Sequence, residues 1–198
     1  MKVFLETERL ILRQFTEDDA DHLFELDSDR EVIRFTNIGL INGGDPIDTD
    51  YEAIKNKKLP RFLKYYEKSD RFGYWAVIEK ASNEFIGWFF LRPALDDITM
   101  HIHSENEIEL GYRLRKASWG KGYATEGSRS LILKSFCELD TQRIVATALA
   151  THAASIRVME KVGLKFEKTF IDQETNQEGV KYALNKDEFE PEKYIATI

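Results

Sequence analysis

The segment from Glu107 to Gly127 carries the residues whose types and spacing best fit chemistry on a bound ligand. Residues 107–114 alternate as a strand does, which places Glu107, Glu109, Gly111 and Arg113 on one face. The glycine-rich turn Trp119-Gly120-Lys121-Gly122 follows, and helical periodicity begins directly after it. The segment is therefore predicted to be a strand, a turn and a helix, with two carboxylates on one face of the strand.

The glycine-rich turn is a candidate site for a pyrophosphate. The first turn of a helix leaves backbone N–H groups unpaired and carries partial positive charge. Gly120 and Gly122 would let a phosphate approach the backbone amides through Ala124, and Lys121 adds a mobile cation. A plain tight turn into a core helix explains the same residues without a ligand, so the turn alone leaves both interpretations open.

Two common phosphate motifs do not match this turn. A P-loop requires G-x-x-x-x-G-K-[ST], and neither glycine ends such a run. A dinucleotide-binding fingerprint requires a third glycine, where this chain has Thr125. It also requires an acid at the end of the next strand, whereas Asp140 stands before that strand. Both motifs are excluded.

Strands and helices alternate around this segment in a way that predicts an α+β fold. Strands are predicted at 9–13, 74–78, 84–91, 107–114, 143–150, 164–170 and 180–185, and helices at 16–26, 51–66, 124–136 and 153–162. Pro60 is predicted to end or kink the second helix, and residues 37–48 are predicted to form a turn-rich loop. The strand–helix–strand order over 107–150 predicts a parallel pair, whereas the short turns predict antiparallel hairpins.

The composition bounds the classes of protein that this chain can be. Its 198 residues fit one domain, predicted here over 1–198, because domains usually have about 100–200 residues. An apolar share of 42 % is enough for a core and excludes an intrinsically disordered chain. The net charge of −7 argues against a general nucleic-acid binder, although a local field can still attract a small anion.

Other features predict a cytoplasmic protein without structural metal or disulfide. Cys137 is the only cysteine, and we expect it to be buried, with a reactive thiol as the alternative. Charged residues from Glu6 onward interrupt the N-terminal apolar run, so no signal peptide is expected. The most apolar stretch, 85–91, is far shorter than the roughly 20 residues of a membrane span. His101, His103 and Glu105 could share a face in the polar loop 96–106, but an exposed loop is the favoured interpretation over a metal site.

Three motifs, in order, resemble the GNAT superfamily of N-acetyltransferases. They are Ile108-Glu109-Leu110-Gly111-Tyr112, then Trp119 to Glu126, then Ala154 to Leu164. The opening Glu6 to Arg13 also resembles this family, so the resemblance covers nearly the whole chain. The tryptophan at position 119, where the general family pattern has Gln or Arg, is similar to the RimJ/RimL-like branch, which includes acetylases of ribosomal-protein N-termini.

The resemblance implies a GNAT fold that binds acetyl-CoA. Its mixed central sheet would be flanked by helices, and its parallel strands 107–114 and 143–150 would part at one end to admit the donor. The pantetheine arm would pair with backbone groups of Tyr112, Arg113 and Leu114. The pyrophosphate would bind the amides of Trp119, Gly120, Lys121, Gly122, Tyr123 and Ala124. No metal is implied.

The resemblance also suggests catalytic residues, with two departures from the family pattern. Glu109 is the candidate base that deprotonates the amine, and an ion pair with a neighbouring residue is the alternative interpretation of this carboxylate. His152 stands where the family has Asn, and it could replace that residue's hydrogen bond to the cofactor, take part in catalysis, or lie at the surface without a role. Met159 stands where many members have a Tyr acid, so Ser155, His152 or water would have to protonate the thiolate.

The predicted function is transfer of an acetyl group from acetyl-CoA to a primary amine by direct attack in a ternary complex. The amine could be a protein N-terminus or a small molecule, and the chain could act as a monomer or a homodimer. No direct binding to nucleic acid or membrane is expected. The alternative is a non-catalytic acyl-CoA-binding or regulatory module that kept the phosphate loop and lost the chemistry, which the presence of Glu109 and Ser155 argues against.

Overall fold

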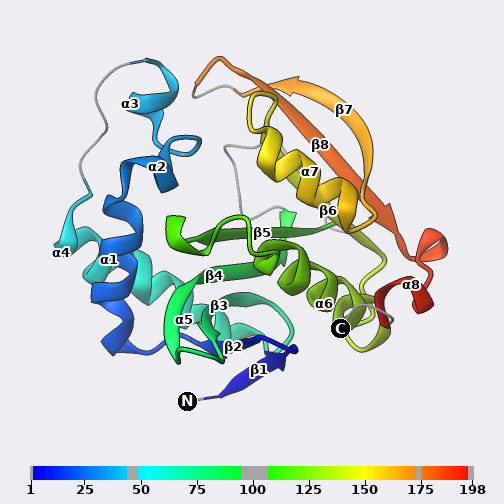
Figure 1. The fold of residues 1–198 in the computed structure, drawn as a ribbon, viewed down its shortest axis with the longest axis horizontal. Helices are drawn as coiled ribbons and strands as arrows, with labels where there is room; N and C mark the ends of the chain where they lie inside the picture. The colour runs from blue at the N-terminus through cyan, green and yellow to red at the C-terminus, as the bar shows by residue number, and fades with distance from the viewer. Residues whose placement is uncertain (1, 44–48, 95–106, 173–174, 196–198) are drawn as a thin grey trace. The chain divides into compact units, whose positions relative to one another are not determined.

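The computed structural model describes residues 2–43, 49–94, 107–172 and 175–195 (Figure 1). Eight strands form one mixed sheet in the order β1-β2-β3-β4-β5-β6-β8-β7. β5 and β6 are parallel, whereas β1/β2, β2/β3, β6/β8 and β7/β8 are antiparallel. The mixed α+β sheet with its parallel pair confirms the predicted fold class. The predicted polar loop 96–106, with His101, His103 and Glu105, lies outside the described residues.

The chain forms two compact units, residues 1–90 with 112–123, and residues 91–111 with 124–198. β4 (Glu84–Pro93) and β5 (Ile108–Leu114) each contribute residues to both units. The prediction of one domain over 1–198 stays a prediction. None of the described helices has the length and apolar character needed to cross a bilayer.

The first unit contains β1 (Val3–Glu6), β2 (Leu10–Gln14), β3 (Gly73–Glu79) and most of β4. Its helices are η1 (Glu17–Asp19), α1 (Ala20–Ser28), α2 (Arg30–Ile33), α3 (Ile38–Ile41), α4 (Tyr51–Ala53), η2 (Ile54–Lys58), α5 (Leu59–Lys68) and η4 (Lys116–Ser118). One apolar core joins α1 and α5 to β3 and β4, and Phe62 stacks on Tyr74 with ring centroids 3.9 Å apart. Each large apolar side chain fully buried there contributes about 1.5–3 kcal/mol.

The second unit contains β6 (Arg143–Leu149), β7 (Lys165–Ile171) and β8 (Glu178–Asn185), with α6 (Tyr123–Cys137), α7 (Ala153–Lys161), η5 (Lys186–Glu188) and α8 (Glu192–Ile195). Leu131, Ile132 and Phe136 form the buried face of α6, as the helical spacing predicted. α7 ends at Lys161, one residue before the predicted end at Val162, and the Gly163 N–H then donates to the Glu160 carbonyl.

Four predictions about local structure were wrong. β1 was missed, although it pairs with β2. Residues 37–48 are not wholly loop, because α3 forms one helical turn there, closed by the Ile41 N–H on the Asn37 carbonyl. Of the two effects predicted for Pro60, ending the helix was wrong: Pro60 lies in the first turn of α5, directly after the wider π-helical turn η2. Cys137 is exposed, because as the last residue of α6 it lies off the face formed by Leu131 and Phe136.

Gly87 in β4 lets two strands of the first unit approach closely. Its φ is +144°, and a Cβ at this position would lie 2.1 Å from the Arg113 carbonyl oxygen and 2.8 Å from the Leu114 Cα. Both atoms belong to the backbone, so neither can move away as a side-chain tip can. The close contact fixes the backbone of β5 at the residues that are predicted to bind the cofactor arm.

We expect Gly87→Ala to lower the free energy of unfolding by about 3 kcal/mol, because it combines overpacking with backbone strain. Urea unfolding monitored by circular dichroism would measure the change. The matched control is Gly43→Ala: Gly43 also has a positive φ, +76°, but a Cβ there meets no atom within 4 Å. If both variants lost the same free energy of unfolding, backbone strain alone, and not the close approach of β5, would explain why position 87 is glycine.

Candidate active site

The candidate cofactor loop begins where β5 ends. η4 forms one turn, and the Trp119 indole N–H then donates to the Leu114 carbonyl at 2.9 Å, which ties the loop back to the strand. Gly120 and Gly122 have φ of +74° and +84°, the left-handed region that favours glycine. α6 starts at Tyr123, so the loop leads into the amino end of a fifteen-residue helix. This geometry confirms the predicted strand, glycine turn and helix.

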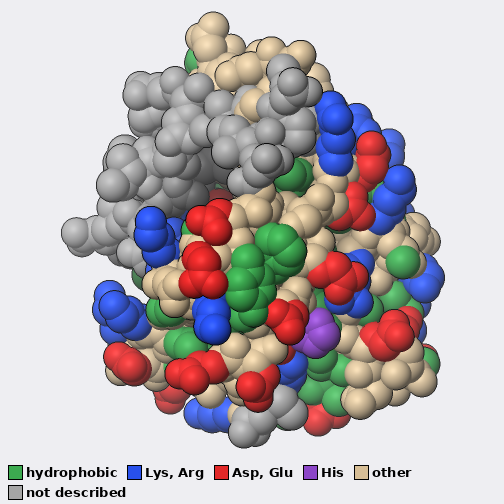
Figure 2. Space-filling view, turned by 90° about the vertical axis from the view of Figure 1, so that its left-hand side faces the viewer, with side chains coloured by type: hydrophobic (Ala, Val, Ile, Leu, Met, Phe, Trp, Pro, Cys, Tyr) green, Lys and Arg blue, Asp and Glu red, His purple; other side chains and the backbone are tan. Residues whose placement is uncertain are grey.

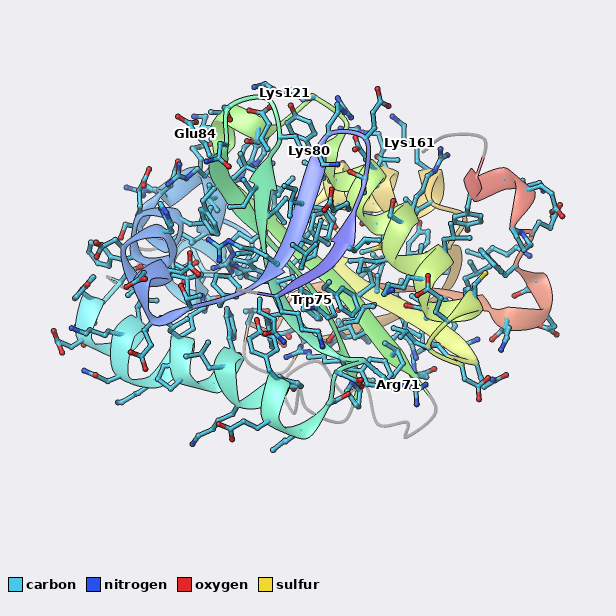
Figure 3. All side chains as sticks on the ribbon, turned by 90° about the horizontal axis from the view of Figure 1, so that it is seen from below. Arg71, Trp75, Lys80, Glu84, Lys121 and Lys161 are labelled. Atoms are coloured by element: carbon cyan, nitrogen blue, oxygen red, sulfur yellow. The ribbon has the colours of Figure 1, made fainter. Side chains whose placement is uncertain are left out.

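Three contacts from Arg9, the residue before β2, and from the end of β3 fix the loop. Arg9 donates to the Lys121 carbonyl at 2.9 Å, and its guanidinium lies 4.6 Å from the centre of the Tyr123 ring. The Tyr123 hydroxyl donates to Glu79, the last residue of β3. Figure 3 labels Lys121 near Lys80 and Glu84 at one edge of its view, so the loop lies at the end of the molecule where β3 turns into β4. A loop fixed in this way can present its amides to an anion without first having to order.

The loop residues differ in how far they are exposed to solvent, and therefore to a ligand. Gly120, Lys121 and Gly122 are exposed, and Trp119 is 44 % exposed, unusually high for a tryptophan. Nothing lies within 4 Å of a Cβ at Gly120, so a phosphate can reach the backbone there. Tyr123 is buried and Ala124 is half-buried. The residues present therefore fit a pyrophosphate bound by main-chain amides.

β5 supplies the other residues predicted to hold the cofactor arm. Tyr112 is half-buried and packs against Phe89, with ring centroids 5.5 Å apart, and Leu114 is buried. The Arg113 side chain binds Asp27 and donates to the Thr36 hydroxyl at 2.7 Å. Within the second unit, the parallel ladder of β5 and β6 covers only Ile108 with Ile144 and Glu109 with Val145, although both strands continue.

Glu109 is buried in the second unit and forms an ion pair, the alternative to its role as a base, with a partner that the sequence did not identify. Its Oε2 accepts from Nε and Nη2 of Arg92, at 2.9 and 2.7 Å. Its Oε1 accepts from the Thr147 hydroxyl at 3.5 Å. The two-donor contact holds the carboxylate in one orientation. Arg92 could have been suspected, because it is a cation placed directly after the most apolar strand of the chain.

Glu107, on the same face, belongs to a second charge cluster. It accepts from Lys181 at 2.8 and 2.9 Å and from Arg143 at 2.9 Å. Burial alone would raise the pKa of Glu107, but the hydrogen bonds from Lys181 and Arg143 outweigh it and hold the pKa below the ordinary glutamate value. Glu107 is thus a structural ion-pair member, and we do not assign it a role in proton transfer.

His152 and Ser155 lie together at the start of α7. His152 is the residue before the helix, and its backbone N–H donates to the Leu149 carbonyl at 2.8 Å. Within the part of the chain that the structure describes, the His152 side chain makes no capping hydrogen bond to α7. Ser155 lies in the first turn, and both side chains are half-buried. Met159, one turn further, is buried and has no proton to donate. Either His152 or Ser155 can therefore present a polar atom at the amino end of α7.

A groove of about 850 Å³ lies on the first unit. It is lined by α1, α2 and the residues after β5: Phe24, Glu25, Leu26, Ser28, Asp29, Val32, Arg115, Lys116 and Ala117. Figure 2 faces the side of the molecule that carries α1, and there acidic and basic side chains surround an apolar patch. The groove's size is in the range of small-molecule sites, about 300–1,000 Å³.

Comparison with known proteins agrees with this geometry. The family model for the acetyltransferase (GNAT) domain matches residues 9–165. The uncharacterized N-acetyltransferase p20 of Bacillus licheniformis is 30 % identical over 171 residues, which cover 86 % of each chain. FsC-acetyl coenzyme A-N(2)-transacetylase of Aspergillus fumigatus is 28 % identical over 191 residues, covering 93 % of this chain and 77 % of the relative. A solved structure of RimL, a ribosomal L7/L12 alpha-N-protein acetyltransferase in complex with coenzyme A, has the same fold, with a TM-score of 0.72 at 15 % identity, covering 95 % of this chain and 100 % of RimL.

We expect Arg9→Met to weaken acetyl-CoA binding about 10-fold, equivalent to about 1.4 kcal/mol, because the loop loses its hydrogen bond at Lys121 and its cation–π contact. Isothermal titration calorimetry measures the dissociation constant. The control is Arg34→Met. The Arg34 guanidinium also lies over an aromatic ring, that of Phe35, but Arg34 directly follows α2. An unchanged affinity in Arg9→Met would mean that the loop keeps its form without Arg9.

Proposed function

Because the chain belongs to the GNAT acetyltransferase family, we propose that it transfers the acetyl group of acetyl-CoA to a primary amine by direct attack in a ternary complex. The observation that carries this proposal is the loop 119–124. Gly120 and Gly122 have a positive φ there and lie directly before α6, and hydrogen bonds made by Arg9 and Tyr123 hold the loop in place. We also propose that residues 1–198 act as one domain, since β4 and β5 each contribute to both compact units.

Bound acetyl-CoA supplies the thioester, and the chain supplies its binding and the movement of protons. We propose that the amides of Trp119 to Ala124 bind the pyrophosphate and that backbone groups of Tyr112, Arg113 and Leu114 pair with the pantetheine arm. Main-chain binding explains why glycines, which leave the amides accessible, matter more at this loop than charged side chains.

Glu109 is the proposed base. An amine is protonated at neutral pH and must lose a proton before it attacks, and a carboxylate can take this proton directly or through water. The place of Glu109 in the motif Ile108 to Tyr112 supports the proposal, and the ion pair with Arg92 fixes the orientation of the carboxylate. Ser155, or His152 in its place, is the proposed donor of a proton to the thiolate, because Met159 cannot serve.

The purified protein should release free coenzyme A thiol when acetyl-CoA is mixed with a suitable amine. The panel should include N-terminal peptides of ribosomal proteins, polyamines, aminoglycosides and amino acids, with protein-free controls. Thiol release with one class of acceptor would establish the activity. If acetyl-CoA binds by calorimetry and no amine is acetylated, a non-catalytic acyl-CoA-binding module is favoured, with Glu109 serving as the ion-pair partner of Arg92. If acetyl-CoA does not bind, the proposed role of the loop is wrong.

In the same assay, Glu109→Gln should lower kcat by about 10²-fold or more, the usual contribution of a positioned base, and leave acetyl-CoA affinity within about 3-fold. Glu178→Gln, at an exposed glutamate of β8, is the matched control and should keep full turnover. Because the amide leaves Arg92 buried without its counter-charge, thermal unfolding must confirm that the variant is folded. Wild-type turnover in folded Glu109→Gln would contradict the assignment.

A further inference from the structure

Three buried charge clusters involve the alternating charged residues of β5 and its start, and they differ in balance. Glu109 pairs with Arg92. Glu107 has two, Lys181 and Arg143, but Glu167 pairs with both of them, which makes two carboxylates for two cations. In the third cluster, in the first unit, Arg113 and Lys58 share one carboxylate among the residues that the structure describes, that of Asp27.

The unbalanced cluster has more hydrogen-bond donors than acceptors. Asp27 accepts from Arg113 through Oδ1 and from Lys58 through Oδ2, so each carboxylate oxygen already serves one cation. Thr36 accepts one further Arg113 N–H at 2.7 Å. A guanidinium has five N–H donors and an ammonium three, so two oxygens and one hydroxyl match only part of the set.

The Trp88 ring lies beside these two cations. The Lys58 ammonium and the Arg113 guanidinium lie 5.8 and 5.4 Å from the centre of its ring. Trp88 is 7 % exposed, and its indole N–H is buried without a hydrogen-bond partner among the described residues. A buried donor without an acceptor costs about 1–3 kcal/mol, so such groups mark places where a partner is missing.

The electrostatics of the cluster point the same way. Burial, and then the neighbouring charge of Arg113, lower the pKa of Lys58 to about 8, while Asp27 opposes the shift and Arg61 adds to it. Burial alone would raise the pKa of Asp27, but Arg113 and Lys58 outweigh it and lower the pKa. The cluster thus carries surplus positive charge beside one committed carboxylate, a setting that a second anion would stabilise.

We propose that the Asp27 cluster (Asp27, Lys58, Trp88 and Arg113) binds the carboxylate of the acceptor, so that the substrates are amines that also carry an acid group. This inference rests on the proposed function. Arg113 connects the two, because its backbone is proposed to hold the cofactor arm while its side chain belongs to the cluster. The cluster can be reached from solvent, since the Lys58 and Arg113 side chains are 23 % and 16 % exposed.

The test uses ω-amino acids of increasing chain length, so that the series covers different distances between the amine and the acid group. Each acid is compared with its carboxamide, which has the same length but lacks the negative charge. Binding is measured by calorimetry with coenzyme A present, so no turnover is needed, and thiol release is measured with acetyl-CoA. We expect at least one acid to bind and react at least 10-fold better than its amide. An aminoalkyl phosphonate of the same length tests whether the anion is a carboxylate.

Lys58→Met keeps most of the side chain's length and removes the surplus charge, so it should abolish the preference for acid over amide. Lys58→Arg should restore it. Lys57→Met, at the exposed neighbour in η2, is the control and should leave the preference unchanged. If Lys58→Met does not fold, raising the pH of the wild type from 7 to 9.5 tests the same charge, because the pKa of Lys58 is about 8 and the pKa of Asp27 is lowered.

The outcomes separate the two proposals. Equal binding of acids and amides, or an unchanged preference in folded Lys58→Met, would overturn the anion site. A preference for the phosphonate over the carboxylate would overturn the assignment of the anion. Failure of every amine to release thiol, with the acids still bound through Lys58, would count against the proposed function and leave the anion site supported.

Discussion

Every buried charge along one face of β5 needs a counter-charge, and this constraint shapes the region around the candidate site. Leaving one ion of a buried pair alone costs about 3–5 kcal/mol, more than most single contacts contribute. Arg92 therefore has to reach Glu109, and Lys181 and Arg143 have to reach Glu107. Within each unit these pairs fix which neighbouring side chain faces the strand. A strand carrying only apolar residues would be compatible with many more arrangements of its neighbours.

The loop after β5 depends on the same strand. The Leu114 carbonyl receives the Trp119 indole, and the close approach at Gly87 leaves the backbone around Arg113 little freedom. Arg9 and Glu79 then hold the far side of the loop through Lys121 and Tyr123. The loop's conformation is thus set by contacts that exist before a ligand binds, which lowers the entropic cost of binding a flexible cofactor.

The local sequence pattern was enough to predict the strand, loop and helix that carry the site. It did not predict features that depend on contacts between distant residues or on a single helical turn. Alternation identified the charged face of β5, and glycine spacing identified the loop, because both signals lie within a few residues. The ion-pair partners were not predictable: Lys58 and Asp27 are 31 residues apart and Arg113 and Asp27 are 86 apart, so only the folded chain brings them together.

The helical turn α3 and the π-helical η2 depend on one or two hydrogen bonds, too few to leave a periodic signal. Cys137 was misjudged because its usual burial was given more weight than its phase on α6.

The acidic composition of the chain and the cationic Asp27 cluster are compatible because they act over different distances. At physiological ionic strength the Debye length is about 8 Å, so most of the net charge of −7 is screened from any one site. The immediate neighbours of an anion decide how tightly it is held, and at the proposed anion site they would be the cations Lys58 and Arg113 beside the Trp88 ring. The overall charge acts on the encounter, which it slows for acidic ligands at low salt. Affinity for an acid group and a net negative charge can therefore coexist in one chain, and the sign of the whole protein is a poor guide to the charge of its substrate.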